Sequence, residues 1–185
     1  DFLIGVIGSL EDCKTVKEDI KNYLKEALKL ELSDEKTLIT NAQKPAKFLG
    51  FDIFIRRSND LRKDINGKTI RSLGHVPVLY LNYETMRKKL FDYKAARIAV
   101  ENGKEIWKSI VRTYMIDLDD LEIVSQFNAE IRGFYNYYSI ANNSPAINSF
   151  YHIMSYSMYK TFARKYKSSV KKILFQYKKD GTFKV

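Results

Sequence analysis

The chain has 185 residues, of which 45% are hydrophobic and 29% charged, so it can bury a core in one domain or two small ones. No stretch approaches the roughly 18 consecutive apolar residues of a membrane helix, which excludes a membrane span. The single cysteine, Cys13, excludes an internal disulfide, and no cysteine and histidine cluster could hold zinc. A lone thiol fits a reducing compartment, so we expect a cytoplasmic protein.

The net charge of +10 is concentrated at the C-terminal end. Residues 1–75 carry 14 basic and 12 acidic side chains, residues 76–159 carry nine of each, and residues 160–185 carry nine basic and one acidic. Such a segment attracts polyanions, because binding releases their condensed counterions. It can also be a solvated tail, since basic termini are common. The charge alone leaves both interpretations open.

The first part of the sequence predicts the order strand, helix, strand, strand. Residues 2–8 are apolar on both faces, which is typical of a strand in a sheet covered on each side. Ser9 and Asp12 resemble a capping box, and the apolar spacing behind them predicts a helix to about residue 30. Residues 36–40 and 48–56 predict two short strands. This piece cannot close its own core, so we expect partner strands upstream of the chain.

The segments that follow predict a change from strands to helices. Residues 57–75 are polar and contain Asn66-Gly67, which predicts a loop or an exposed hairpin. Residues 76–81 predict one more extended segment. The apolar spacing then predicts a helix over about 83–101, ended by Asn102-Gly103.

Three further helices are predicted in the last third of the chain. The apolar residues of 121–138 keep the helical period for about five turns. Ser144-Pro145 supplies a cap and a first-turn proline for the next helix, which runs to about Phe162. Ser168 or Ser169 can cap a last short helix that ends near residue 177. The fold class predicted from these elements is α+β, with the helices in the C-terminal part.

Aromatic and cationic side chains stand close together near the end of the helix predicted over 121–138. Rings beside cations are how proteins stack bases and hold nucleic-acid backbones. Tyr135 and Tyr138 lie on the apolar stripe of this helix, which favours a place in the core. Tyr137 and Asn136 lie off the stripe, next to Arg132, and we interpret them as contacts to nucleic acid.

Five sequence blocks resemble one family in the same order. Asp1–Ile4 resembles the residues after the first Asp of the Tyr-Ala-Asp-Asp turn of reverse transcriptases, and Leu32–Thr37 and Phe48–Ile53 resemble the next two polymerase blocks. Asn128–Tyr138 resembles the signature of the maturase thumb, called domain X, and Lys160–Lys165 fits the basic helix that follows it. The chain thus resembles the C-terminal part of a group II intron-encoded reverse transcriptase/maturase.

The resemblance implies a domain organisation and a function. Residues 1–75 would be the C-terminal part of the polymerase palm, and residues 76–185 an all-α thumb or domain X. The family binds group II intron RNA to promote splicing, and its thumb clamps the RNA template and DNA primer during RNA-directed DNA synthesis. A further partner would be the missing N-terminal fingers and palm portion of the same protein.

The resemblance also implies catalytic residues. The family uses two Mg²⁺ ions held by carboxylates. The two essential aspartates lie outside this sequence, and Asp1 would be an auxiliary catalytic carboxylate and metal ligand. We therefore expect no polymerase activity from this chain alone. Lys36 would donate a proton to the leaving pyrophosphate, or else be an ordinary surface lysine.

Phe48, Leu49 and Gly50 resemble the primer grip, the strand that holds the primer backbone in this family. Gly50 would let that backbone approach closely, because a Cβ would obstruct it; a strand bulge is the alternative explanation. The residues that we predict to bind RNA are basic or polar and lie in the two helical blocks: Arg132, Asn136, Tyr137, Lys160, Arg164, Lys165, Lys167, Lys171 and Lys172. Four of them recur at helical spacings of three and four residues, so we expect them to share a face: Lys160, Arg164, Lys167 and Lys171.

Two other functions stay open at this point. One is a reverse transcriptase of the retron or phage-defence kind, without a splicing role; the block Arg132–Tyr138 argues against it, because it resembles maturase thumbs. The other is a non-enzymatic, basic helical RNA-binding module, against which the palm-like blocks of residues 1–56 argue.

Overall fold

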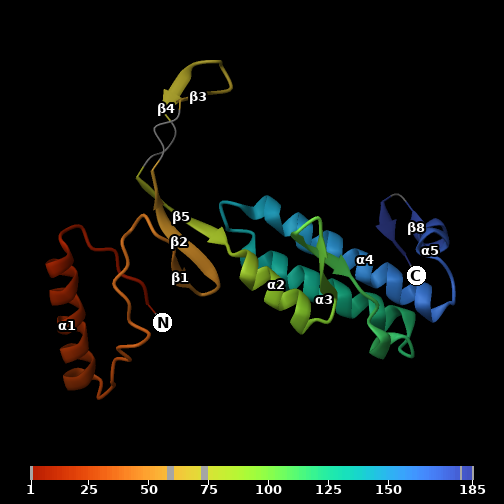
Figure 1. The fold of residues 1–185 in the computed structure, drawn as a ribbon, viewed down its shortest axis with the longest axis horizontal. Coiled ribbons are helices and arrows are strands. Elements are labelled where there is room, and N and C mark those ends of the chain that lie inside the picture. Colours follow the sequence, from red (N-terminus) through yellow and green to blue (C-terminus); the bar gives the residue numbers. More distant parts are fainter. Residues whose placement is uncertain (1, 58–60, 72–74, 180, 185) are drawn as a thin grey trace. The chain divides into compact units, whose positions relative to one another are not determined.

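The computed structural model describes residues 2–57, 61–71, 75–179 and 181–184, and the chain forms two compact units, Asp1–Val78 and Leu79–Val185 (Figure 1). The predicted α+β class is confirmed, with small antiparallel sheets first and helices in the C-terminal part. Within the described residues, no helix is long and apolar enough to cross a membrane.

Helix α1, Leu10–Ala27, begins at the predicted capping box. The Ser9 hydroxyl accepts a hydrogen bond from the Asp12 backbone N–H at 3.2 Å, and the Asp12 carboxylate accepts one from the Ser9 N–H at 2.6 Å. These two bonds satisfy donors that the first turn of a helix leaves free. None of the residues of α1 is buried, so its apolar stripe is not covered within the described part of the unit.

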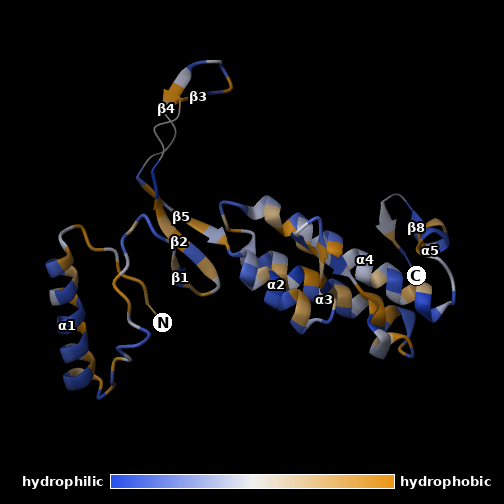
Figure 2. Ribbon diagram, viewed as in Figure 1, coloured by the Kyte–Doolittle hydropathy of each residue, from blue (hydrophilic) through white to orange (hydrophobic). Residues whose placement is uncertain are grey.

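Two predicted strands of the first unit are wrong. Residues 2–8 and residues 36–40 form no strand. A strand needs a neighbour to pair its backbone groups, and the described part of this unit supplies none to either segment. The apolar side chains of the first segment are accordingly exposed, Phe2 by 52% and Ile7 completely. Figure 2 shows this segment as a largely hydrophobic stretch between the N-terminus and α1.

The predicted strand over residues 48–56 is in fact a hairpin. Strand β1, Ala46–Phe48, pairs antiparallel with β2, Phe51–Arg56, and the register joins Phe48 to Phe51. The loop between them has only two residues, Leu49 and Gly50, whose φ angles are 49° and 79°. Positive φ at both positions is the geometry of the type I′ turn that tight hairpins favour. The apolar residues on both sides of Gly50 favoured one strand, in which the glycine would allow a close approach or a bulge, so the turn was not predicted.

The rest of the first unit follows the predictions. Strands β3, Leu61–Lys63, and β4, Thr69–Arg71, form a hairpin in the polar segment. The Asp64 carboxylate closes its turn by accepting the backbone N–H groups of Asn66 and Lys68. The predicted extended segment is strand β5, Val76–Leu81, and the three-stranded sheet has the order β1-β2-β5. Strand β5 leads the chain into the second unit.

The second unit begins with helix α2, Tyr83–Asp92, which Asn82 caps by accepting the Glu84 N–H at 2.7 Å. The prediction that this helix continues to residue 101 is wrong. Strands β6, Ala96–Glu101, and β7, Lys104–Ser109, form a hairpin there. Asn102 and Gly103 have φ angles of 51° and 73°, a second type I′ turn. Asn-Gly is common in hairpin turns as well as at helix ends, and in this chain it forms the hairpin turn.

The three predicted C-terminal helices are confirmed. They are α3, Asp120–Tyr138, α4, Ile147–Lys165, and α5, Val170–Tyr177. The 3₁₀ turns Thr113–Met115 and Ser144–Ala146 precede α3 and α4, and the short strands β8, Lys178–Lys179, and β9, Thr182–Phe183, follow α5. Helix α4 is the centre of this unit, because it packs against α2, α3, α5 and the β6–β7 hairpin.

The core of the second unit contains aromatic residues from α3 and α4. Phe127, Phe150 and Phe162 are fully buried, and the ring of Phe134 stacks on that of Phe150 with centroids 3.8 Å apart. Each ring removes a large apolar area from water, which is the main favourable term in folding. The second unit thus supplies a rigid base for side chains on the outer faces of α4 and α5.

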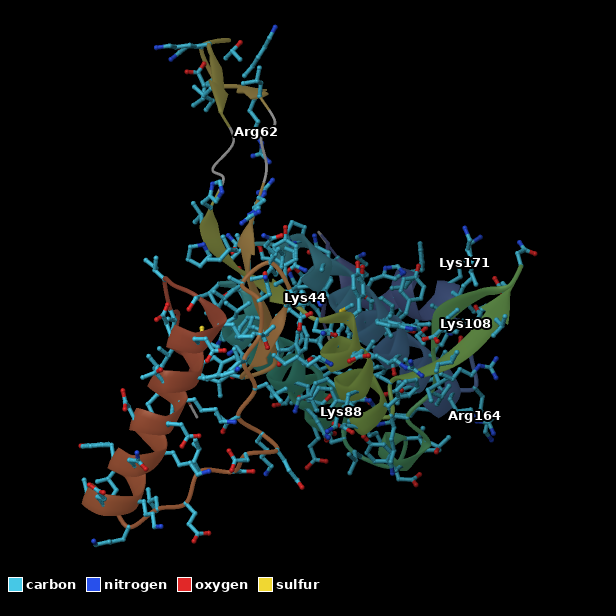
Figure 3. All side chains as sticks on the ribbon, turned by 60° about the vertical axis from the view of Figure 1, so that its left-hand side comes forward. Lys44, Arg62, Lys88, Lys108, Arg164 and Lys171 are labelled. Carbon is cyan, nitrogen blue, oxygen red and sulfur yellow. The ribbon has the colours of Figure 1, made fainter. Side chains whose placement is uncertain are left out.

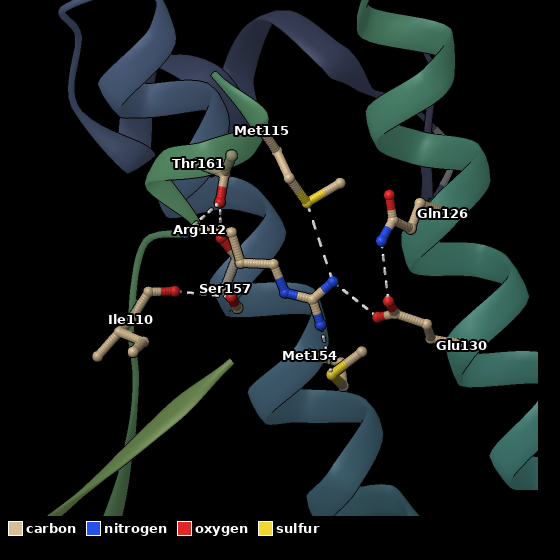
Figure 4. Close-up of polar contacts among 8 residues, drawn as sticks. All are labelled: Ile110, Arg112, Met115, Gln126, Glu130, Met154, Ser157 and Thr161. Carbon is tan, nitrogen blue, oxygen red and sulfur yellow. Dashed lines mark hydrogen bonds and ion pairs between the residues drawn. The ribbon is translucent and has the colours of Figure 1, made fainter. Parts of the chain in front are cut away.

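A buried ion pair joins the segment after β7 to helices α3 and α4 (Figure 4). The Arg112 guanidinium lies 2.7 Å from the Glu130 carboxylate and 4.1 Å from the centroid of the Phe127 ring. The Arg112 N–H donates to the Thr161 hydroxyl at 3.1 Å, and the Ser157 hydroxyl donates to the Ile110 carbonyl at 2.6 Å. These contacts fix the end of β7 against α4.

Candidate nucleic-acid interface

A basic groove lies where α4 ends and α5 begins. Its volume is about 780 Å³, and it is open to solvent. Its lining combines four cations with one carboxylate and several small or apolar residues: Val111, Ile116, Asp117, Lys160, Ala163, Arg164, Lys165, Lys167, Ser168 and Val170. Four of the nine residues predicted to bind RNA therefore line one groove.

A tight turn between α4 and α5 shapes this groove. Lys167 has a φ of 46°, the left-handed conformation that commonly ends a helix, and the Ser168 N–H donates to the Ala163 carbonyl at 2.8 Å. The Ser169 hydroxyl then caps α5 by accepting the Lys172 N–H at 3.3 Å. The local sequence thus stops one helix and starts the next within four residues, with Arg164 in the last turn of α4 and Lys167 in the turn between the helices.

Lys160 is anchored at the edge of the groove. Its ammonium is half-buried and donates to the Ser109 carbonyl at 2.6 Å. Burial lowers the pKa of Lys160, and the nearby charges of Arg97 and Lys108 lower it further. An ammonium has three N–H donors, so two are left for another acceptor after the bond to Ser109. Lys160 is therefore a preorganised cation.

Lys165 is held by acceptors of its own unit. Its ammonium donates to the Leu118 carbonyl at 2.5 Å and lies 2.6 Å from the Asp120 carboxylate. The Tyr166 hydroxyl also donates a hydrogen bond to Asp120. This bond is the main cause of the raised pKa of Tyr166, and burial is the second. Because Asp120 offsets the charge of Lys165, we expect Lys165 to attract phosphate less than Arg164 or Lys167 does.

The remaining basic residues of this region are exposed. Arg164 and Lys167 are exposed at the groove, and Lys171 and Lys172 are exposed on α5, outside the groove lining. Figure 3 shows Arg164 and Lys171 extending from the ribbon. The helical spacing from Lys160 to Lys171 does not describe one helix face, because α4 ends before Lys167. The fold still brings three of these four residues to the groove.

The α3 residues predicted to bind RNA are exposed but do not line the groove. Arg132, Asn136 and Tyr137 are on the outer side of α3, and the Tyr137 ring packs edge-on against Tyr138 with centroids 4.8 Å apart. The prediction that Tyr138 belongs to the core is confirmed. The same prediction is wrong for Tyr135, which is 56% exposed, because it lies at the border of the apolar stripe.

The candidate catalytic and primer-grip residues belong to the first unit. Lys36 is exposed in a turn, where its N–H donates to the Ser33 carbonyl at 3.2 Å. Phe48 ends β1, and Leu49 and Gly50 form the hairpin turn, so Gly50 serves a left-handed turn and not a strand. Asp1 lies outside the described residues. The catalytic and primer-grip roles stay predictions.

The described residues offer no magnesium site. No three aspartate, glutamate, histidine or cysteine side chains of the part that the structure describes gather where they could hold a metal ion. A carboxylate-rich cluster is the donor set that Mg²⁺ requires.

Three basic residues of this region were not among those predicted from the sequence. Arg97 and Lys108 belong to the β6–β7 hairpin, which was predicted as a helix and an unassigned segment. The Asn-Gly pair between two short runs containing β-branched residues was the signal for this hairpin. Arg112 is buried with Glu130, and the sequence carried no signal for that pairing.

Sequence comparisons identify the family of the second unit. Residues 80–182 match the family described as type II intron maturase. The chain belongs to this family of group II intron maturases and reverse transcriptases.

Individual relatives extend over nearly the whole chain. The group II intron-encoded protein LtrA of Lactococcus lactis subsp. cremoris is 41% identical over 182 residues, which cover 98% of this chain and 30% of LtrA. The putative COX1/OXI3 intron 1 protein of Saccharomyces cerevisiae is 36% identical over 179 residues, covering 90% of this chain and 20% of that protein. The chain thus spans less than a third of the curated relatives that it matches.

Proposed function

We propose that this chain binds group II intron RNA through the basic groove at α4 and α5 and thereby promotes splicing. The observation that carries the proposal is the groove itself, which gathers four cations inside the segment that matches the maturase family. The name of the relative LtrA, a group II intron-encoded protein, supports an intron as the source of the RNA.

The groove suits a phosphate backbone better than it suits individual bases. Arg164 can bind a phosphate through two parallel N–H groups, and Lys160 and Lys167 add charge on either side. Such contacts position RNA and give affinity, with modest reading of sequence. A protein that binds the folded RNA more tightly than unfolded forms shifts the RNA population towards the folded form, and no protein catalysis is needed.

We propose the polymerase role for the longer protein. Residues 1–75 would be the end of the palm and residues 76–185 the thumb, which clamps the RNA template and DNA primer. Fingers, the remaining palm and a Mg²⁺ site would come from upstream, and this chain alone would not polymerise. Two features support an upstream partner: the exposed apolar residues of 2–8 and the lack of buried residues in α1. Strands that are apolar on both faces belong in a sheet that other elements cover on each side.

A salt series on four substitutions tests the RNA contact. We expect a variant with Arg164→Ala and Lys167→Ala in the groove lining and Lys171→Ala and Lys172→Ala on the adjoining α5, called the groove variant below, to lower affinity for a group II intron RNA. The slope of log K against log salt should flatten by about one unit per lost phosphate contact. A filter-binding or fluorescence-anisotropy titration at several salt concentrations measures both.

The matched control removes the same charge from the first unit. Lys14→Ala, Lys25→Ala, Lys29→Ala and Lys44→Ala should leave the slope nearly unchanged. An unchanged slope in the groove variant would show that the cluster faces bulk water. Equal affinity of the unsubstituted chain for intron RNA and for an unrelated structured RNA would reduce the chain to a generic polyanion binder and remove the maturase proposal.

A further inference from the structure

The β6–β7 hairpin places two cations directly opposite each other. Its register pairs Arg97 of β6 with Lys108 of β7. Like charges on opposed residues of an antiparallel pair destabilise the hairpin, whereas opposite charges there stabilise it. The next charged pair on the same face is of the favourable kind, because Glu101 lies opposite Lys104. The repulsive pair is next to the pair of Ala96 and Ser109, at the end of the hairpin opposite to the turn. Ser109 contacts α4 at this end.

A third cation reaches this end of the hairpin from α4. The Lys160 ammonium donates at 2.6 Å to the carbonyl of Ser109, which follows Lys108 and pairs across the hairpin with Ala96, the neighbour of Arg97. The bond holds Lys160 at the end of the hairpin where Arg97 and Lys108 are opposed. The lowered pKa of Lys160, caused first by burial and then by Arg97 and Lys108, agrees with this placement.

The carboxylates of the hairpin only partly offset these charges. Lys108 forms an ion pair with Glu101, which lies at the turn end of the hairpin. Glu105 accepts the Trp107 indole N–H at 2.8 Å and lies 3.7 Å from the Arg87 guanidinium. Arg97, Lys108 and Lys160 carry three positive charges, and the ion pair of Lys108 with Glu101 offsets one of them, so a net charge of +2 remains.

We propose that Arg97 and Lys160 form a phosphate-binding site that extends the RNA contact from the groove onto the β6–β7 hairpin, with a smaller contribution from Lys108, because Glu101 offsets its charge. The inference rests on the proposed function, because it assigns the phosphate to the backbone of the same RNA. Lys160 lines the groove and also meets the hairpin, so the two surfaces are continuous. A bound phosphate offsets the mutual repulsion of these cations, because each of them attracts it.

A phosphate-binding role predicts that one substitution changes two quantities in opposite directions: the RNA affinity falls and the unfolding midpoint rises. A structural role would lower the midpoint. Arg97→Gln removes one cation that is exposed and opposed to Lys108. We expect RNA affinity at 0.1 M salt to fall about tenfold, as for a lost charge-assisted hydrogen bond, and the salt slope to flatten by about one unit. The unfolding midpoint of the free chain should rise by about 1–3 °C, because the repulsion is relieved.

Trp107, the single tryptophan of the chain, lies in β7, so its fluorescence follows the unfolding of this hairpin directly. Lys104→Gln is the matched control on the same hairpin. It removes the same charge, but Lys104 faces Glu101, so we expect nearly unchanged RNA affinity and a midpoint that does not rise. Both variants are made in the whole chain.

Three outcomes would overturn the phosphate site. The first is an R97Q chain that binds intron RNA as tightly as the unsubstituted chain while the groove variant binds more weakly; the groove proposal would then survive without the hairpin. The second is a midpoint that falls in R97Q, which would make Arg97 a structural residue. The third is an effect of R97Q on binding of inorganic phosphate but not of RNA. A groove variant that binds intron RNA as tightly as the unsubstituted chain would instead count against the proposed function.

Discussion

The two units of the chain have similar apolar sequence patterns but cover them to very different extents. In the second unit, α3 and α4 bury Phe127, Phe150 and Phe162 completely. In the first unit, α1 buries none of its residues, and Phe2 is half-exposed in a segment without strand structure. An apolar pattern predicts that a face is to be buried, but it does not say whether the covering partner is in the same chain.

The difference bears on which unit can position a site. The basic groove and the hairpin site are built on the second unit, where α4 is held on several sides by buried aromatic residues. The catalytic and primer-grip candidates belong to the first unit, in which many apolar side chains of the described residues are exposed. We therefore expect RNA binding from this chain and polymerase chemistry only from the longer protein.

Matched phenylalanine substitutions give the largest expected contrast between the units. Phe150→Ala removes a fully buried ring that stacks on Phe134, and it should cost about 3–5 kcal/mol of unfolding free energy. Phe2→Ala removes an exposed ring and should change that free energy by less than about 0.5 kcal/mol. Urea unfolding followed by Trp107 fluorescence measures the first, and far-ultraviolet circular dichroism measures both. A large loss in Phe2→Ala would show that the first unit covers its own apolar surface.

Breaking one ion pair in each unit sharpens the comparison. Glu130→Gln leaves the buried Arg112 guanidinium without its carboxylate, and we expect a loss of about 3 kcal/mol. Glu11→Gln breaks the exposed pair with Lys14 on α1 and should cost less than about 0.5 kcal/mol. The measurement is again denaturant unfolding. Arg112→Leu combined with Glu130→Met should recover most of the loss; if it does not, the pair contributes more than mutual charge compensation.

The smallest effect concerns a pH-dependent contact of the first unit. Hydrogen bonds from Lys21 and then Lys17 lower the pKa of the Asp34 carboxyl below its ordinary value of 3.8. The ammonium groups lie 2.9 Å and 3.2 Å from its oxygens. The stabilisation from a lowered carboxyl pKa is present above the ordinary value and is lost as the pH falls through the lowered one. It should therefore disappear only in strong acid.

An NMR titration of the Asp34 carboxyl tests this contact. Lys21→Gln should raise its pKa towards the ordinary value, while Lys14→Gln, on another part of α1, should not. A carboxyl that titrates normally in the unsubstituted chain would show that α1 does not hold the turn at Asp34.

Local signals in the sequence were sufficient wherever the structure depends on neighbours along the chain. The capping box at Ser9, the five-turn apolar stripe of α3 and the cap at Ser169 each gave a helix in the predicted place. The concentration of positive charge after residue 160 likewise predicted the region of the groove. Each of these features depends on residues only a few positions apart.

Features that depend on distant residues needed the folded chain. Asn102-Gly103 suits a helix end as well as a hairpin turn, and only the pairing of β6 with β7 decided between them. Tyr135 and Tyr138 share one stripe, yet packing against the core buried only Tyr138. In sequence, Lys165 does not differ from its basic neighbours, but in the structure its ammonium lies 2.6 Å from the Asp120 carboxylate. No spacing along the chain indicates which acceptor a lysine will meet.

The sequence by itself determined the family, the C-terminal helices and the positive charge of the last 26 residues, because these depend on short motifs, short periods and composition. Only the tertiary structure decided which cations meet at one groove, which are neutralised within the fold, and that Arg97 and Lys108 stand opposite each other beside Lys160. The reason is that electrostatic energy depends on distances in space, and a chain sets those distances only after its apolar faces have found their partners.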